Sequence, residues 1–295
     1  MPLGLALALL LSLAQAQVLT IPELRKRVYG EGGFRVERVL EERPGFTRVQ
    51  FSHLSDGLRV HGFANLPKAR GSFPVVAVLH GYVEPSRYRL LAYTTPYADF
   101  LAERGFLVLH PNYRGHPPSE GSPARGLRHP YAVDVLNLLA EVRKGAFPQA
   151  DPARIALFGH SMGGGVAQVV SLVDSRLKGV VLYASMSGDE RLNPERIRYW
   201  SQGRRGGELF TLPEEVLKAA SPWTYLEELS VPYSVHHGTK DAQVPPEWSF
   251  ALCRRLKDLG KPVACLAYPA GHLFRGEADR VFRERALAFL RRVLR

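Results

Sequence analysis

A serine set between glycines is the first group in this sequence that could do chemistry. Gly159, Ser161 and Gly163 form a G-x-S-x-G pattern, which directly follows the apolar run 155–158 and precedes a helical pattern beginning near Met162. A strand, a tight turn and a helix in this order lift a serine hydroxyl out of a sheet. The helix N-terminus also offers backbone N–H groups and a partial positive charge to a developing oxyanion. Ser161 is therefore predicted to be a nucleophile.

A base and an orienting acid follow later in the chain. A serine hydroxyl is a weak nucleophile near neutral pH and needs both. Asp241 comes just past the apolar pattern 231–237, and His272 follows the next one, at 263–268. Alone, Asp241 could be a turn-capping residue and His272 an ordinary loop histidine. Their order, with each residue at the end of a strand, predicts a Ser161–Asp241–His272 triad.

Two backbone amides are expected to form the oxyanion hole. One should belong to the residue after the nucleophile, Met162, and the other to a loop after an early strand. The apolar run 74–79 leads into His80, Gly81 and Tyr82. The second donor is assigned to the Tyr82 amide, with the Gly81 amide as the alternative.

Alternating strand and helix patterns must position these residues. Amphipathic helical patterns separate the apolar runs, which is typical of a single, open, mostly parallel α/β sheet with antiparallel strands at its N-terminal side. The antiparallel entry strands are expected at 34–40, 46–53 and 58–66, the buried strands at 74–79, 106–109, 155–158, 180–183, 231–235 and 263–268, and the helices at 95–104, 130–144, 162–174, 246–259 and 277–294.

One long connection departs from this alternation of strands and helices. Residues 187–228 replace a short crossover and are rich in Arg, Glu, Trp and Tyr. Long connections are usually functional or contain helices of their own, so this insertion is predicted to be a small cap over the catalytic pocket. The alternative is a solvent-exposed segment on the protein surface with no role at the pocket. The chain is otherwise expected to form one catalytic domain over residues 17–295.

The first 16 residues resemble a secretory leader. They contain no Asp, Glu, Lys or Arg, and the apolar run from Leu3 to Leu13 ends in Ala14-Gln15-Ala16, a small-x-small cleavage pattern. The missing basic residue departs from the usual leader. An apolar helix packed on the body, or a start codon assigned too early, would explain the same pattern. A cleaved leader predicts a secreted or periplasmic protein, and an uncleaved one a cytoplasmic protein.

Composition and charge exclude several classes of protein. The chain has 295 residues, of which 45% are hydrophobic and 23% charged, and its glycines and prolines show no repeat period. No apolar run outside the N-terminus is long enough to span a bilayer. The net charge of +11 comes from dispersed residues, which argues against a nucleic-acid partner. A small-molecule substrate is expected, and the oligomeric state is left open.

No metal or cofactor is expected. Two cysteines are too few for a thiolate zinc site, and the histidines lack ligand partners at metal-binding spacing. Cys253 and Cys265 fall in a helix and the next strand, so they could form a disulfide in an oxidising compartment or remain two buried thiols. Asp134, on the helical pattern 130–144, is expected to face solvent.

The motifs together resemble the α/β-hydrolase superfamily, and within it the catalytic domain of the prolyl oligopeptidase family and its esterase relatives. The resemblance covers roughly residues 57–295 and implies the fold and triad given above. In similar proteins the Arg114 segment organises the loop after its strand, so a structural role is expected for Arg114, with a contact to substrate as the alternative. The matching segments are Leu79-His80-Gly81, Asn112-Tyr113-Arg114-Gly115, Gly159-His160-Ser161-Met162-Gly163-Gly164, Ser221-Pro222-Trp223, His237-Gly238-Thr239-Lys240-Asp241 with Val244-Pro245, and Gly271-His272.

Two departures from the family pattern affect the expected substrate. Family peptidases usually carry a large β-propeller, whereas only about 40 residues precede the matching region after the leader. Tyr82 stands where a second glycine is usual. Without a propeller the size filter for peptides is missing, so the expected function is a serine hydrolase that cleaves carboxylic esters through an acyl-enzyme, with a peptidase acting on short peptides as the alternative. A protein that keeps the triad but only binds a ligand is the second alternative.

Overall fold

The computed structural model describes residues 18–124, 127–205, 207 and 211–295. The leader predicted at residues 1–16 therefore lies outside the described residues. No described helix is long and apolar enough to cross a membrane.

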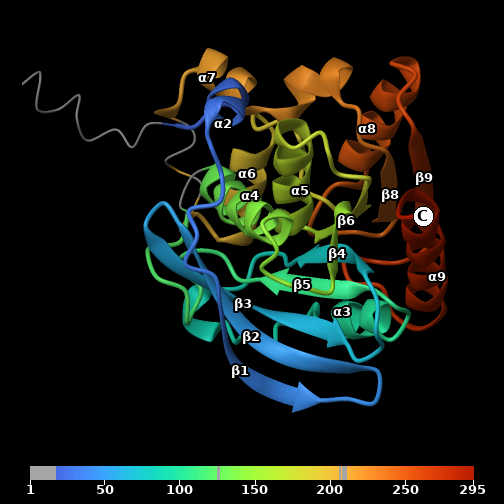
Figure 1. The fold of residues 1–295 in the computed structure, drawn as a ribbon. Coiled ribbons are helices and arrows are strands. Elements are labelled where there is room, and N and C mark those ends of the chain that lie inside the picture. The colour runs from blue at the N-terminus through green and yellow to red at the C-terminus, as the bar shows by residue number, and fades with distance from the viewer. Residues whose placement is uncertain (1–17, 125–126, 206, 208–210) are drawn as a thin grey trace, which may run out of the picture.

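A twisted sheet of nine described strands forms the centre of the molecule (Figure 1). The strand order is β1-β2-β3-β5-β4-β6-β7-β8-β9. The first three strands run antiparallel to their neighbours, and every pair from β5 to β9 is parallel. The bounds are β1 Arg35–Glu42, β2 Phe46–Ser55, β3 Leu58–Pro67, β4 Phe73–Leu79, β5 Leu107–Pro111, β6 Ala150–His160, β7 Gly179–Tyr183, β8 Tyr233–Gly238 and β9 Val263–Tyr268.

Helices cover both faces of this sheet (Figure 1). Because successive side chains of a strand point to opposite faces, Val75 and Ala77 join one buried apolar cluster and Val76 and Val78 the other. Residues of α2 (Ile21–Lys26), α4 (His129–Arg143), α5 (Met162–Val173) and α8 (Pro246–Asp258) belong to the first cluster. Residues of α3 (Thr95–Ala102) and α9 (Gly276–Val293) belong to the second.

The predicted fold class is confirmed. The sheet is mostly parallel, its antiparallel strands lie at the N-terminal side, and helices pack on both faces. Parallel strands align their carboxyl ends along one edge of a sheet. The loops that follow β4, β6, β8 and β9 therefore start from the same edge, and these loops carry the predicted site residues.

The described part of the long connection 187–228 is largely helical, and buried polar contacts hold it in place. It contains α6 (Asn193–Trp200), α7 (Glu214–Ala220) and the 3₁₀ segment η3 (Pro222–Glu228). Glu190 forms a buried ion pair with Arg128, and its backbone N–H donates to the Ser221 hydroxyl at 2.8 Å. That this segment caps a catalytic pocket stays a prediction.

Asp134 corrects one expectation from the sequence. Its side chain is fully buried rather than facing solvent. It accepts the Arg114 backbone N–H at 2.9 Å and pairs with the Arg114 guanidinium at 2.6 Å. The partner that makes burial of this carboxylate tolerable is 20 residues away, so the helical pattern around Asp134 could not reveal it.

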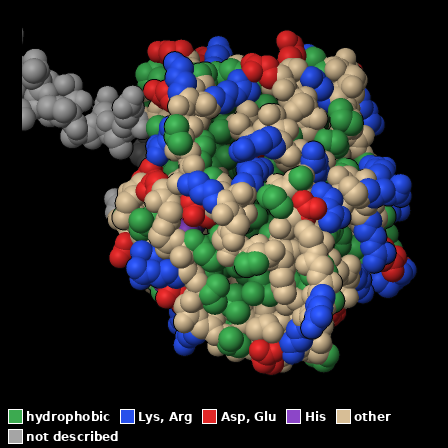
Figure 2. Space-filling model, viewed as in Figure 1, with side chains coloured by type: hydrophobic (Ala, Val, Ile, Leu, Met, Phe, Trp, Pro, Cys, Tyr) green, Lys and Arg blue, Asp and Glu red, His purple; other side chains and the backbone are tan. Residues whose placement is uncertain are grey.

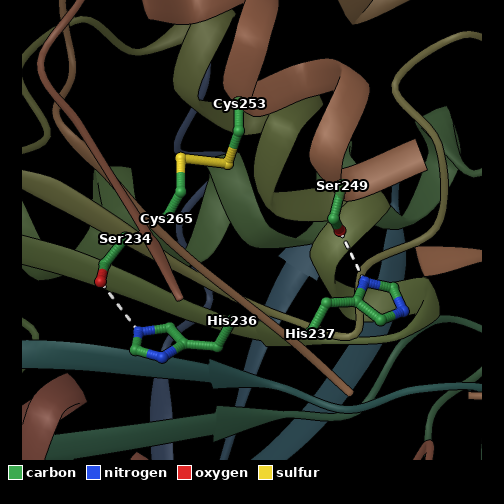
Figure 3. Close-up of a disulfide and its surroundings, with 6 residues drawn as sticks. All are labelled: Ser234, His236, His237, Ser249, Cys253 and Cys265. Atoms are coloured by element: carbon green, nitrogen blue, oxygen red, sulfur yellow. Dashed lines mark hydrogen bonds between the residues drawn. A yellow bond between two sulfur atoms is a disulfide. The ribbon is translucent and has the colours of Figure 1, made fainter. Parts of the chain in front are cut away.

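A disulfide joins Cys253 on α8 to Cys265 on β9, with the two Cα atoms 6.1 Å apart (Figure 3). Of the two possibilities that the sequence left open for these cysteines, the structure therefore contains the disulfide.

Candidate active site

Ser161 occupies the sharp turn between β6 and α5 in a backbone conformation unusual for a side-chain-bearing residue. Its φ is 54° and its ψ −118°. Glycines make this turn possible, because a Cβ on Gly163 would lie 2.2 Å from the Leu79 carbonyl oxygen, and one on Gly159 would lie 2.4 Å from that of Gly163. Backbone strain of this kind persists where the surrounding structure enforces it, as it often does at functional sites.

Asp241 and His272 are brought together from the loops after two neighbouring strands, β8 and β9. The His272 Nδ1–H donates to Asp241 Oδ2 at 2.8 Å, and both side chains are buried. Asp241 Oδ1 accepts two backbone N–H groups, from Gln243 at 2.8 Å and Val244 at 3.0 Å. This arrangement fixes the His272 ring and leaves its Nε2 as the nitrogen that can act as a base.

The same hydrogen bonds determine the charge of Asp241. Burial alone favours the neutral acid, but donors on His237 and His272 outweigh it and hold the pKa of Asp241 well below its usual range. The group is therefore a carboxylate throughout the neutral range. A carboxylate is what an orienting acid must be if it is to stabilise an imidazolium.

His160 connects the turn that carries Ser161 to His272. The rings of His160 and His272 lie 4.7 Å apart between centroids. His160 Nε2 lies 3.3 Å from the His272 carbonyl oxygen and therefore carries the hydrogen. Burial lowers the pKa of His160 well below its usual value, so its ring is neutral. The residue before the predicted nucleophile thus holds the loop of the predicted base.

The loop after β4 lies directly against the serine turn. A Cβ placed on Gly81 would be 2.9 Å from Ser161 Cβ, so this position accepts only glycine. The Gly81 N–H donates to the Tyr93 hydroxyl at 2.9 Å. Of the two amides considered for the oxyanion hole, the Gly81 amide therefore already has a partner. That leaves the Tyr82 amide as the better candidate beside the Met162 amide.

Sequence reasoning missed two residues of this site. Tyr93 bonds both Gly81 and His160 Nδ1, the latter at 2.6 Å, although it lies 67 residues before His160. His237 donates to Asp241, although its place in a motif assigned it no role. The one available signal was the position of His237 four residues before the predicted acid.

Segment 187–228 contacts two loops of the site. The Trp200 Nε1–H donates to the Gln243 carbonyl at 2.6 Å, two residues after Asp241. The Arg205 guanidinium lies over the Tyr82 ring, 4.6 Å from its centroid. A separate surface hollow of about 480 Å³ is lined by α6 and the turn after it rather than by the predicted triad.

The described residues contain no group of His, Cys, Asp or Glu side chains arranged to hold a metal ion. Lys and Arg side chains are scattered over the visible face, with Asp and Glu among them, rather than gathered in one patch (Figure 2).

The chain resembles known proteins over most of its length. A model of the prolyl oligopeptidase family matches residues 93–295. An uncharacterised peptidase of Bacillus subtilis, YtmA, is 27% identical over 226 residues, which cover 73% of this chain and 82% of that protein. A second uncharacterised peptidase of that bacterium, YuxL, is 24% identical over 225 residues, but the match covers only 33% of its length.

Solved structures show the same fold. An acetyl xylan esterase from Paenibacillus sp. R4 has a TM-score of 0.70 at 19% identity, over 93% of this chain and 92% of that one. An acylaminoacyl peptidase from Pyrococcus horikoshii has a TM-score of 0.69 at 22% identity, over 85% of this chain and 42% of that one.

Proposed function

Because the chain belongs to the prolyl oligopeptidase family, we propose that it is a serine hydrolase that cleaves carboxylic esters through an acyl-enzyme. Ser161 is the nucleophile, His272 the general base and acid, and Asp241 the carboxylate that orients His272. The observation that carries this proposal is the 2.8 Å hydrogen bond between His272 and Asp241, in a loop that His160 ties to the Ser161 turn.

The reaction follows from these positions. His272 Nε2 takes the proton of the Ser161 hydroxyl as its oxygen attacks the acyl carbonyl, and the Tyr82 and Met162 amides donate to the tetrahedral oxyanion. The C–O bond to the alcohol breaks as His272 returns the proton to the leaving oxygen. Water then attacks the acyl-enzyme by the same route, which releases the acid and restores Ser161. No cofactor takes part.

An ester is favoured over an amide by the chemistry of the leaving group. The extent of the matches does not separate the two, because the acetyl xylan esterase is matched over 92% of its length and the peptidase YtmA over 82% of its own. An alkoxide is a better leaving group than an amine, so a triad of this kind cleaves an ester more readily than the corresponding amide. Cleavage of short peptides remains the second candidate, because the family and the second solved structure are named for peptidases.

Replacing the nucleophile tests the proposal. Ser161→Ala should lower kcat for p-nitrophenyl acetate by about four orders of magnitude or more, because the acyl-enzyme can no longer form. Ser171→Ala is the matched control: this buried serine lies on α5, the helix that follows Ser161, but its hydroxyl bonds Tyr233 rather than the site. A Ser161→Ala protein as active as the parent would contradict the mechanism.

Two further measurements on the parent distinguish an esterase from a peptidase, and an enzyme from a protein that only binds its ligand. Nitrophenyl esters of increasing acyl length should be cleaved faster than aminoacyl nitroanilides, and the reverse order would favour the peptidase. A fluorophosphonate probe should label Ser161 covalently. A folded protein that the probe does not label would support a protein that only binds its ligand.

The expected secreted or periplasmic location is part of the same proposal. It is supported by the Cys253–Cys265 disulfide, because disulfides persist mainly in oxidising compartments. An intact mass showing loss of residues 1–16 from the protein in its native compartment would test it.

A further inference from the structure

We propose that His237 is a positioning residue for the Asp241 carboxylate, and that Ser249 fixes the orientation of His237. This inference rests on the proposed triad, because it concerns how its acid is held. His237 ends up beside Asp241 because β8 continues into the loop that carries the carboxylate. The side chain of His237 is completely buried.

The contacts of His237 determine which of its nitrogens carries a hydrogen. Nε2 lies 3.0 Å from Asp241 Oδ2 and 3.2 Å from the Val244 carbonyl oxygen. Both are acceptors, so Nε2 must be the donor. Nδ1 lies 2.6 Å from the Ser249 hydroxyl, which in the neutral ring donates to it (Figure 3). Ser249 therefore favours the one tautomer that can hold Asp241.

Asp241 is held from two sides as a result. Its Oδ2 accepts from His237 and from His272, at 3.0 and 2.8 Å, while its Oδ1 accepts the two backbone N–H groups. The carboxylate cannot rotate without breaking several of these bonds. The hydrogen bond from His237 also takes a share of the negative charge that would otherwise act on His272.

Helix α8 presents Ser249 to His237, and the disulfide fastens that helix to the sheet. Cys253 lies one helical turn after Ser249, and its partner Cys265 lies on β9, which pairs with β8. A hollow of about 200 Å³ is lined by His237, Ser249 and both cysteines, among others. It leaves room for a methyl group, so a small substitution at position 249 need not disturb the fold.

The neighbouring histidine supplies a matched control. The rings of His236 and His237 lie on opposite sides of β8, and each is bonded to a serine (Figure 3). Ser234 Oγ lies 2.8 Å from His236 Nε2, and the Tyr268 hydroxyl lies 2.8 Å from His236 Nδ1. This pair makes the same kind of contact as Ser249 and His237 but holds no residue of the triad.

The experiment measures kcat and kcat/KM for p-nitrophenyl acetate, and the rate of fluorophosphonate labelling, from pH 5 to pH 9. The titratable groups that interact electrostatically with Asp241 or His237 are His272, His160 and Tyr183, and the Arg196 guanidinium donates to the Ala242 and Gln243 carbonyls of the same loop. Loss of the His237 donor leaves more negative charge on Asp241 toward His272. A more negative carboxylate stabilises the protonated form of the base, so the acidic limb of the activity profile should move to higher pH.

We expect His237→Leu to lower kcat by about 10- to 100-fold with little change in KM, and to move the acidic limb of the profile up by about 0.5–1 pH unit. His237→Gln keeps an N–H donor, so it should retain much of the parent's kcat and much of the parent's acidic-limb position. Ser249→Ala should lower kcat by about 3- to 10-fold, whereas Ser249→Thr, which keeps the hydroxyl, should retain the kcat of the parent. Ser234→Ala should leave activity unchanged.

Unchanged kcat and an unmoved acidic limb in Ser249→Ala and the His237 variants would overturn the inference. A lowered kcat with an unmoved limb would also overturn it, because it would indicate a purely structural loss. Measurements on the parent separate failure of the proposed function from failure of the positioning role: if the parent shows no Ser161-dependent labelling, the proposed function fails. If it is labelled normally and only the variants behave otherwise than expected, the positioning role alone fails.

Discussion

A chain of hydrogen bonds at the residue scale connects three loops of the candidate site. The Gly81 N–H donates to the Tyr93 hydroxyl, and that hydroxyl donates to His160 Nδ1. On the other side of the ring, the His160 Nε2–H donates to the His272 carbonyl. The loop expected to hold the oxyanion, the turn of the nucleophile and the loop of the base are thus tied together through two side chains.

Tyr93→Phe should uncouple these loops. The change removes one hydroxyl, leaving the Gly81 N–H and His160 Nδ1 without their shared partner, so the oxyanion loop loses its fixed position. We expect kcat for p-nitrophenyl acetate to fall by about 10- to 100-fold, and the free energy of unfolding by about 1–3 kcal/mol.

The control for this change is Tyr88→Phe. Tyr88 also bonds through its hydroxyl, but to the Asn112 side chain at 2.8 Å. The Tyr88→Phe change should lower the free energy of unfolding by a similar amount with a smaller effect on kcat. Equal losses of kcat in the two variants would show that Tyr93 acts only through stability.

At the scale of elements, β9 is the outer parallel strand of the sheet, and the disulfide joins it to α8. The side chains of β9 are mostly half-buried, and one neighbour, β8, supplies all of its strand pairing among the described residues. The disulfide from Cys265 to Cys253 compensates for the missing second neighbour. Edge strands are generally weak points of a sheet, and here the edge carries the loop of His272.

Removing the disulfide should therefore weaken this edge first. Replacing both Cys253 and Cys265 by Ser should lower the free energy of unfolding by about 3 kcal/mol, as expected for a bridge that closes a short loop. Chemical denaturation with and without a reducing agent measures the effect.

Reduction of the parent should lower its free energy of unfolding by the same amount, and the stability of the double variant should not respond to the reducing agent. Equal stability of the oxidised parent and the double variant would contradict this prediction. Hydrogen exchange in β9 should rise more than in β4, which lies in the middle of the sheet.

For the whole molecule, the unusual feature is the burial of its histidines. The sequence has ten, and nine are buried in the structure. Burial lowers the pKa of His53 to about 4 and those of His110 and His236 to about 3. These side chains stay neutral in the folded protein at a pH at which the unfolded chain would bind protons.

The protein should therefore lose stability as the pH falls below 6.5. Between pH 6.5 and the lowered pKa values, the unfolded state binds more protons, so each of the three histidines lowers the free energy of unfolding by up to about 1.4 kcal/mol per pH unit. Above pH 7 these groups are neutral in both states and contribute no slope.

Urea denaturation at pH 7 and pH 5 tests this expectation. The free energy of unfolding should be several kcal/mol lower at pH 5 than at pH 7. Proton uptake on unfolding, measured by calorimetry near pH 5.5 in two buffers, should be two or more. His53→Gln should reduce the uptake by about one proton. Equal stability at the two pH values would contradict the proposed cause.

The sequence by itself determined the strand and helix pattern and the order of the candidate residues. Both follow from local rules. The polarity pattern predicts which segments form buried strands, and parallel strands bring the residues just beyond their ends to one edge. Ser161, Asp241 and His272 could therefore be proposed without coordinates.

Only the tertiary structure decided which side chains support those three. Tyr93 reaches His160 across 67 residues, Arg114 neutralises Asp134 across 20, and Ser249 meets His237 across 12. The same holds for the disulfide, which the sequence left as one of two possibilities. Such contacts depend on how helices and loops pack against the sheet, and packing brings together residues whose separation in the sequence follows no period.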